Sequence, residues 1–598
     1  MWRASACVQL CLPLLAAQLV AAASDAGAAL ASRVPSRLLD VTIDGADGSF
    51  NVSVGGTAWL TSVTPRFFAG GQWANLTLVS TATAPPLAGF SAGTAWRWST
   101  SGSQGAAVWE TTIRKSSSGA DATMFSQTYL QEQSSHGFQG APCPNISHGN
   151  TAAGCSAPPK QGSRISVSEF SLSEFPSVRV SRDGPALGAF CGAGMSDGPR
   201  LSAFNSPGYS PTDDTNQPGN WGGEAGGPTA LFDDSPDRKT LVISPAGADI
   251  LSTIWWGMAG SGEMAVGPGA GVPTVPANHT VHTLMLAGRG MRQTFVDYGD
   301  AMMAFSGVKS RERLRSTIKS EITLSHLGYS TTGCYQYNPC DCGCGCGNDH
   351  GCPPGQGTKK SRCSCQQCVP SDNATIKGCK SMGDTFLLVD QYIRNELRLN
   401  YSHILMDSFW YGESVNPGVW KWEDSADLVY DLFPAGLEGT HSALLKQRGG
   451  QPLEIKAHST NWDVNSPYRN DSRFASTNFC GAGTSCAEAN TPHIFLPGVA
   501  LYTYLFKSGK RWGLSHIKQD HEGPGPSLNE GIAVGKNWYK AMGDGAAAAG
   551  SFVSYCGMTP RVLMNSVNVA VSTHARASHD YVPGQVRKSD IMVSWIAV

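Results

Sequence analysis

The sequence predicts an α/β fold of the (β/α)8 TIM-barrel type in its C-terminal half, preceded by an antiparallel β-sandwich domain. Short alternating apolar segments, separated by Gly, Pro and Asn turns, fill the N-terminal half, as is typical of antiparallel sheets. From residue 322 onward, apolar strand segments instead alternate with amphipathic helical segments at the spacing of βα units. The 598 residues are enough for two such domains.

Residues 1–23 have the pattern of a secretory signal peptide. Arg3 precedes an apolar run from Ala6 to Val20, and small residues follow at Ala21–Ser24. Because the run is too short to span a bilayer, this pattern favours a cleaved leader over a membrane anchor or a buried helix. No later run is long and apolar enough to cross a membrane, so we expect no transmembrane segment in the mature chain. The expected location is secreted, or the lumen of an endomembrane or vacuolar compartment.

Charge and cysteine content agree with this location. The net charge is -2 and the basic residues form no stripes, so nucleic acid is not an expected partner. Of 18 cysteines, Cys7 and Cys11 would leave with the leader, and an even number in a secreted chain predicts disulfide bonds. Sites for N-glycosylation occur at Asn51, Asn75, Asn145, Asn278, Asn373, Asn400 and Asn470.

The N-terminal β domain is expected over residues 34–293. Its tryptophans could stack on sugar rings, but their spacing is more typical of a buried sheet face. The next domain should span 294–598, entered through a helix within Arg292–Leu314. The strand segments of the first domain are Leu39–Ile43, Trp59–Phe68, Ala95–Thr100, Ala107–Lys115, Arg164–Leu172 and Lys239–Ser244, and the tryptophans are Trp59, Trp96, Trp98 and Trp109.

A cysteine-rich insertion occupies residues 334–379. Its CDCGCGCG and CSCQQC runs resemble metal-thiolate spacing, with His350 as a further ligand, but in an oxidising compartment a knot of disulfides is the default. The insertion follows the first expected barrel strand, Ile322–Tyr329, and would therefore lie at the C-terminal face of the barrel.

The other barrel elements follow in order. Expected strands are Tyr401–Gly412, Leu453–Trp462, Trp512–Asp520, Gly550–Met558 and Asn568–Tyr581. Expected helices between them are Thr385–Leu399, Glu438–Gly450, Pro497–Gly509, Ile532–Ala549 and Val562–Val567. After Asp580 the chain offers at most one short strand, so we expect the barrel to be incomplete.

Polar and aromatic residues gather at the ends of these strands. Two strands each end in a carboxylate, Asp520 and Asp580, which is what glycoside hydrolysis on a barrel requires: one group attacks the sugar while the other handles the leaving-group proton. A nearby cation should keep the nucleophile ionised, whereas the acid needs a drier pocket. Lys456 and Trp462, on the expected strand Leu453–Trp462, are also expected to bind substrate.

The segments ILMDSFWYG, IKQDHE and RASHDY resemble the clan of retaining glycosidases that contains α-galactosidases, raffinose synthases and seed-imbibition proteins. The resemblance covers less than half of the chain. It implies that Asp520 is the nucleophile and Asp580 the acid/base, that Lys518 and Arg576 contact sugar hydroxyls, and that Asp407 with Trp410 holds the non-reducing sugar. The expected partner is an oligosaccharide or glycoconjugate, and no cofactor is needed.

Several alternatives stay open. Asp407, Asp520 and Asp580 could each be helix N-caps, and Glu413 and Glu522 are rival carboxylates. A metal site at His516, His521 and Asp520 lacks a further ligand at convincing spacing, so none is expected. The main functional alternative is a catalytically inactive secreted protein that binds carbohydrate or serves as a structural glycoprotein.

Overall fold

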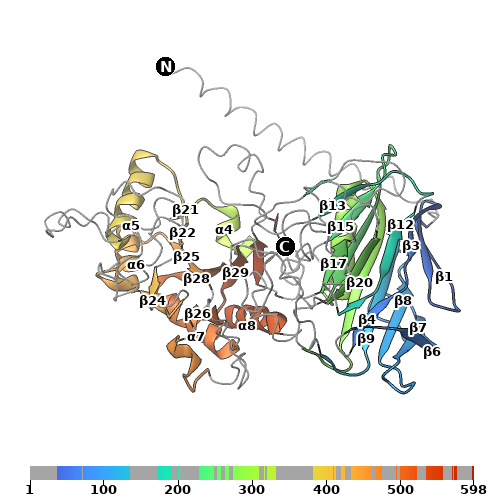
Figure 1. The fold of residues 1–598 in the computed structure, drawn as a ribbon. Helices are drawn as coiled ribbons and strands as arrows, with labels where there is room; N and C mark the ends of the chain where they lie inside the picture. The colour runs from blue at the N-terminus through green and yellow to red at the C-terminus, as the bar shows by residue number, and fades with distance from the viewer. Residues whose placement is uncertain are drawn as a thin grey trace, which may run out of the picture.

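A computed structural model describes the chain in the following ranges. They are 37–69, 72–134, 172–181, 183–191, 200–201, 228–247, 252–256, 263–268, 274–308, 316, 319–331, 382–407, 410–412, 419–424, 433–460, 462–463, 465–474, 493–494, 498–520, 534–556, 569, 571–575 and 596–597. The signal peptide, the cysteine-rich insertion and the segment with Arg576 and Asp580 lie outside these residues. Antiparallel sheets occupy one side of Figure 1 and a parallel sheet with its helices the other.

Antiparallel sheets form the N-terminal part, as the alternating segments predict. A six-stranded sheet has the order β1 (Leu39–Ile43), β2 (Phe50–Val54), β3 (Thr57–Ser62), β12 (Ser177–Val180), β18 (Glu263–Pro268), β17 (Ser252–Trp256). A nine-stranded sheet has the order β14 (Arg200–Leu201), β13 (Gly188–Cys191), β15 (Thr229–Phe232), β16 (Lys239–Ala246), β20 (Thr280–Arg289), β9 (Ala122–Tyr129), β8 (Trp109–Lys115), β7 (Gly93–Thr100), β6 (Leu76–Ala84). Smaller sheets join β11 (Ser173–Glu174), β4 (Arg66–Ala69) and β5 (Gln72–Ala74), and β10 (Gln133–Ser134) with β19 (Thr274–Val275).

The two large sheets contact each other through buried side chains. The ring of Phe50 on β2 lies 5.0 Å from that of Phe125 on β9. The amide of Gln127 on β9 donates hydrogen bonds to the carbonyls of Phe175 and Val266, at 2.9 and 3.0 Å, and so ties the sheets together. The prediction that the N-terminal tryptophans belong to the core is confirmed, because Trp59, Trp96, Trp98 and Trp109 are all buried.

Helix α2 (Met291–Phe305) follows the last of these strands. It packs on β16 and β20, and the Tyr298 hydroxyl donates to the Ser244 hydroxyl at 2.8 Å. The helix is therefore packed with the antiparallel part, whereas the expected boundary between residues 293 and 294 falls inside it. The domain limits themselves stay a prediction.

The C-terminal part is built on a curled sheet that forms part of a barrel. Six parallel strands and one antiparallel strand have the order β21 (Gly328–Ser330), β22 (His403–Met406), β25 (Glu454–Ser459), β28 (Leu514–Gln519), β29 (Phe552–Tyr555), β30 (Ser572–Ala575), β31 (Ile596–Ala597). The helices are α4 (Ile322–Ser325), α5 (Met382–Gln391), the π-helical turn η8 (Tyr392–Glu396), α6 (Gly436–Gln447), α7 (Val499–Gly509), η10 (Lys510–Trp512) and α8 (Val534–Ala548). Short pairs join β23 (Tyr411–Gly412) with β24 (Lys421–Asp424) and β26 (Trp462–Asp463) with β27 (His493–Ile494), and η9 spans Pro467–Arg469.

The expected first strand, Ile322–Tyr329, is wrong over most of its length. Ile322–Ser325 is a short helix because the Glu321 carboxylate accepts a hydrogen bond from the Thr323 amide at 2.9 Å, which caps it. The strand is only Gly328–Ser330, and a side chain at Gly328 would collide with the His403 ring. The expected helix Thr385–Leu399 is shifted toward the N-terminus: it begins at Met382 and ends in a π-helical turn at Glu396.

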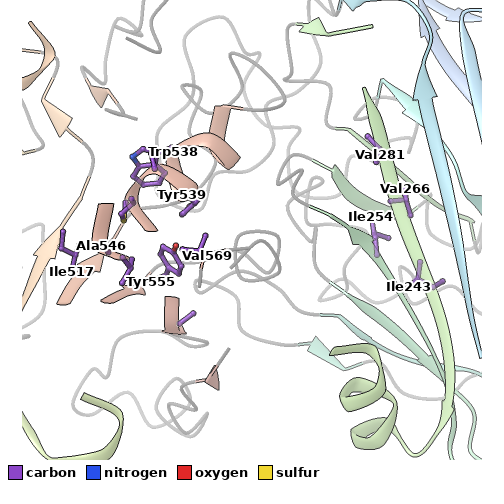
Figure 2. Packing of buried hydrophobic residues seen from close by; sticks show 14 of the residues in the cluster. Ile243, Ile254, Val266, Val281, Ile517, Trp538, Tyr539, Ala546, Tyr555 and Val569 are labelled. Atoms are coloured by element: carbon purple, nitrogen blue, oxygen red, sulfur yellow. The ribbon is translucent and has the colours of Figure 1, made fainter. Parts of the chain in front are cut away.

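The parallel sheet has two different faces. Tyr555 on β29 packs against Tyr539 on α8 at 5.3 Å, and Ile517 and Val569 belong to the same buried cluster. Figure 2 shows these residues near Trp538 of α8, on one side of the view, and labelled residues of the antiparallel sheets from the same cluster on the other side. Because side chains alternate along a strand, the polar residues His516 and Lys518, which flank Ile517 on β28, point to the opposite face.

Candidate active site

Three charged residues meet at the carboxyl ends of neighbouring parallel strands. Asp407 follows β22, Lys518 lies near the end of β28, and Asp520 follows that strand. The Lys518 ammonium donates to Asp407 Oδ2 at 2.8 Å and lies 3.9 Å from Asp520 Oδ2. One lysine thus bridges two carboxylates from separate strands, as the convergence of parallel strand ends predicts.

A histidine from the strand between them completes the cluster. His458 on β25 places Nε2 3.2 Å from Asp520 Oδ2 and 3.8 Å from Asp407 Oδ1. Strand pairing places His458 directly beside Lys518. The cluster is therefore built from three adjacent strands of one sheet.

Burial differs sharply between the two carboxylates. The Asp407 side chain is 3% exposed and that of Lys518 6%, whereas the Asp520 side chain is 16% exposed. His458 is 1% exposed. Within this cluster, Asp520 is the carboxylate that a solute can reach, and Asp407 is the buried partner that fixes Lys518.

The charge of Lys518 is maintained in spite of its burial. Burial alone would lower the pKa of Lys518, but Cys556, Asp407 and Asp520 together outweigh this effect and raise the pKa above its ordinary value. The lysine is therefore an ammonium ion at neutral pH. An ammonium ion next to a carboxylate favours the ionised form of that carboxylate, so Asp520 can act as an anion.

A second polar layer lies deeper on the same face of the sheet. The Lys456 amine contacts His574 Nε2 on β30 at 2.8 Å. Glu321 lies 3.3 Å from His516 Nδ1 on β28 and 3.9 Å from His574 Nδ1. The expected substrate-binding residue Lys456 thus belongs to a buried layer beneath the cluster, at 5% exposure.

Burial favours the uncharged forms of the basic groups in and around this deeper layer. It lowers the pKa of Lys456 to about 7, against the opposing effect of Glu321. Burial, with the neighbouring Lys456, also lowers the pKa of His403 to about 4 and depresses the pKa values of His516 and His574. These histidines are neutral at physiological pH.

Trp410 and Trp462 are fully buried and do not present a ring face to solvent. Trp410 packs against Trp422 at 5.0 Å and Trp512 at 5.6 Å, and its indole N–H donates to the His458 carbonyl at 3.0 Å. Trp462 packs edge-on against Tyr468 at 5.4 Å. In this structure Trp410 supports the cluster through His458, and a sugar contact by either tryptophan stays a prediction.

The structure describes only some of the other expected site residues. Asp407, Lys518 and Asp520 are brought together, whereas Arg576 and Asp580 lie outside the described residues, as do Glu413, Glu522 and His521. The expected separation between Asp520 and Asp580 therefore stays a prediction. Within the described ranges, no group of His, Cys, Asp and Glu side chains is arranged to hold a metal ion, and no helix is long and apolar enough to cross a membrane.

Sequence reasoning did not single out His458, Glu321 or His574. A signal for His458 was present, because Lys456 and His458 are polar residues at alternate positions of an otherwise apolar strand and so share one face. His516, Lys518 and Asp520 repeat this spacing on the adjacent strand. No comparable signal marks Glu321, which reaches His516 from a position 195 residues away in the sequence.

Comparison with known proteins bears on this architecture. No protein-family model matches the chain, and no curated protein sequence matches it. Among solved structures, a quadruple mutant of α-N-acetylgalactosaminidase NagBb from Bifidobacterium bifidum is similar over 94% of this chain and 82% of its own, with a TM-score of 0.51 and 11% identity. The chain shares a glycosidase fold. At this identity the similarity concerns the fold alone.

Two further glycosidase structures are more distant. A glycoside hydrolase family 97 enzyme from Pseudoalteromonas sp. strain K8, in complex with acarbose, matches 90% of this chain and 67% of its own, with a TM-score of 0.37 and 8% identity. A GH27 β-L-arabinopyranosidase from Geobacillus stearothermophilus matches 34% of this chain and 50% of its own, with a TM-score of 0.26 and 12% identity.

Proposed function

We propose that this chain is a retaining glycoside hydrolase acting on α-linked sugars, with Asp520 as the nucleophile. The observation that carries the proposal is the geometry of Asp520: a partly exposed carboxylate at a strand end, contacted by a buried ammonium ion and a buried histidine. A nucleophilic carboxylate needs to be ionised, oriented and reachable, and this environment supplies all three conditions.

The reaction would proceed through two displacements. In the first, the Asp520 carboxylate attacks the anomeric carbon while the bond to the leaving-group oxygen breaks, and that oxygen takes a proton from Asp580. In the second, water attacks the same carbon, gives a proton to Asp580, and releases Asp520 as a carboxylate. A sugar hydroxyl in place of water would make the same chain a glycosyl transferase.

The other site residues have supporting roles in this proposal. Lys518 would donate to a sugar hydroxyl while Asp407 holds its ammonium group in place, as the 2.8 Å ion pair supports. Arg576 would add a second cation at the substrate. The assignment to the α-galactosidase and raffinose synthase clan, the complete (β/α)8 barrel and the N-terminal β-sandwich belong to the same proposal.

A secretory location is part of the proposal as well. Its support is the leader-like sequence together with the positions of the glycosylation sites. Among the described residues, the asparagines of these sites are all exposed, as attachment of a glycan requires. They are Asn51, Asn75, Asn278, Asn400 and Asn470.

The function is tested by a release assay on the secreted protein with nitrophenyl α- and β-glycosides. Wild type should release nitrophenol from an α-galactoside or a related α-glycoside, and Asp520→Ala and Asp580→Ala should each abolish release. Asp544→Ala, at an exposed position of α8, is the matched control and should keep full activity. A folded wild-type protein that turns over none of the substrates would instead favour an inactive carbohydrate-binding protein.

A further inference from the structure

The environment of His458 is more constrained than that of an ordinary core histidine. Its backbone carbonyl accepts hydrogen bonds from the indole N–H groups of both Trp410 and Trp422, at 3.0 and 3.1 Å. Its ring stacks on Tyr411, with a centroid distance of 6.0 Å and an interplanar angle of 16°. Trp410 and Trp422 therefore fix the backbone of His458, and Tyr411 fixes its ring.

The ring is aimed at the candidate nucleophile. Nε2 lies 3.2 Å from Asp520 Oδ2, and the hydroxyl of Tyr411 lies 3.5 Å from Nδ1 on the other side of the ring. An ionised carboxylate can only accept hydrogen bonds, so Nε2 must carry the proton. In the neutral ring Nδ1 is then an acceptor, which matches a hydroxyl donor on that side.

We propose that His458 is a positioning residue that fixes the rotation of the Asp520 carboxylate and stabilises its negative charge. This inference rests on the proposed function of Asp520. During the second displacement the bond between Asp520 and the sugar breaks and the carboxylate recovers its charge, so a donor already placed at Oδ2 assists its departure. His458 itself forms no bond to the substrate.

The aromatic residues take on a defined role in this account. Trp410, an expected sugar-binding residue, acts through the His458 carbonyl. Among the described residues, the charged and titratable groups that face the His458–Asp520 pair include Asp407 after β22, Lys518 on β28, Tyr411 on β23 and Cys556 after β29, which interacts electrostatically with Lys518. These groups are unchanged in the variants below, so a shift between variants reports on His458.

The test compares full-length wild type with His458→Leu, which lacks the donor, and His458→Gln, whose amide can replace Nε2. His441→Leu is the matched control, because the His441 ring also makes a hydrogen bond, to the Leu453 carbonyl at 2.9 Å, but lies on α6. His458→Asn, whose amide is too short to reach Oδ2, replaces His458→Leu if that variant does not fold.

The first measurement does not depend on turnover. A water-soluble carbodiimide with an amine nucleophile modifies protonated carboxyl groups, and peptide mass spectrometry follows modification of Asp520 against pH. Loss of a donor to the charged form should move the midpoint upward by about one pH unit in His458→Leu. His458→Gln and His441→Leu should keep the wild-type midpoint, and coincident midpoints in all variants would overturn the inference.

The second measurement is steady-state turnover on the best nitrophenyl glycoside. His458→Leu should lower kcat by about tenfold to a hundredfold with little change in KM, because a misplaced nucleophile loses the reactive geometry. The acid limb of its pH profile should move to higher pH, and His458→Gln should restore most of the rate. An unchanged kcat and pH profile in His458→Leu would count against the positioning role.

The two proposals fail in different ways. If the Asp520 midpoint moves but the folded wild type hydrolyses no glycoside, the proposed function is wrong and the His458 contact stands. If the wild type is active and neither the midpoint nor kcat responds to His458→Leu, the positioning role is wrong and the function stands.

Discussion

Replacing Asp407 by Asn should destabilise the C-terminal part by about 3 kcal/mol, because it leaves Lys518 with one distant carboxylate. Lys518 and Asp407 are 6% and 3% exposed, so solvent does not screen their 2.8 Å contact. At an effective dielectric constant of about 20, such a contact is worth about 6 kcal/mol, and the 3.9 Å contact with Asp520 that remains about 4 kcal/mol. Breaking a buried pair by removing one partner typically costs about 3–5 kcal/mol, and the remaining contact places this case at the lower end.

A double-mutant cycle separates this pair from general damage. The free energy of unfolding is measured in urea for wild type, Asp407→Asn, Lys518→Met and the double variant, using tryptophan fluorescence. Trp410, Trp422 and Trp512 lie together beside the cluster and report on this part of the chain. The coupling energy should be about 2–3 kcal/mol.

The control pair is Lys540 and Asp544, which are exposed and one helical turn apart on α8. Asp544→Asn should change the free energy of unfolding by no more than about 0.5 kcal/mol. A coupling energy for Asp407 and Lys518 that is as small as that of the surface pair would mean that burial does not strengthen the Asp407–Lys518 contact.

Titration and glycosylation give the remaining predictions. The folded-state pKa of Lys456 is about 7, so the unfolded chain binds more protons than the folded chain from about pH 7 to about pH 10.5. The free energy of unfolding should therefore rise with pH across this window. Lys456→Met should flatten the rise, as measured by urea unfolding at each pH. The pKa of His403 is lowered to about 4, so the free energy of unfolding should fall as pH drops from about 6.5 to 4. His403→Gln should weaken this loss. Equal slopes of the free energy against pH in wild type and His403→Gln would contradict this role of His403. Treatment of the secreted protein with an enzyme that removes N-linked glycans should lower the protein's mass in steps. Each step should disappear when the corresponding exposed asparagine is changed to Gln. An unchanged mass after treatment would argue against the secretory route.

Much of the framework could be predicted from the sequence. The order of parallel strands follows from the alternation of apolar strands and amphipathic helices, and the meeting of Asp407, Lys518 and Asp520 follows from their places at strand ends. Such features depend on local patterns and on the geometry of parallel sheets, which need no knowledge of long-range packing.

Other features depend on contacts between distant segments. Periodicity could place His458 and Lys456 on one face, but only the register of β25 with β28 sets His458 beside Lys518. Trp410 follows a strand end, and the sequence does not reveal that packing against Trp422 and Trp512 buries its ring. Ile322–Ser325 has an apolar pattern suited to a strand, and capping by Glu321 makes it a helix.

In the proposed mechanism, Asp520 forms a covalent bond to the sugar. Wild type should be incubated with a 2-deoxy-2-fluoro glycosyl fluoride of the sugar that it hydrolyses, and its peptides analysed by mass spectrometry. We expect one added glycosyl group on the peptide that contains Asp520. The label should accumulate as activity falls and should be absent in Asp520→Ala. Inactivation with the label on another carboxylate, or turnover with no label on Asp520, would contradict it.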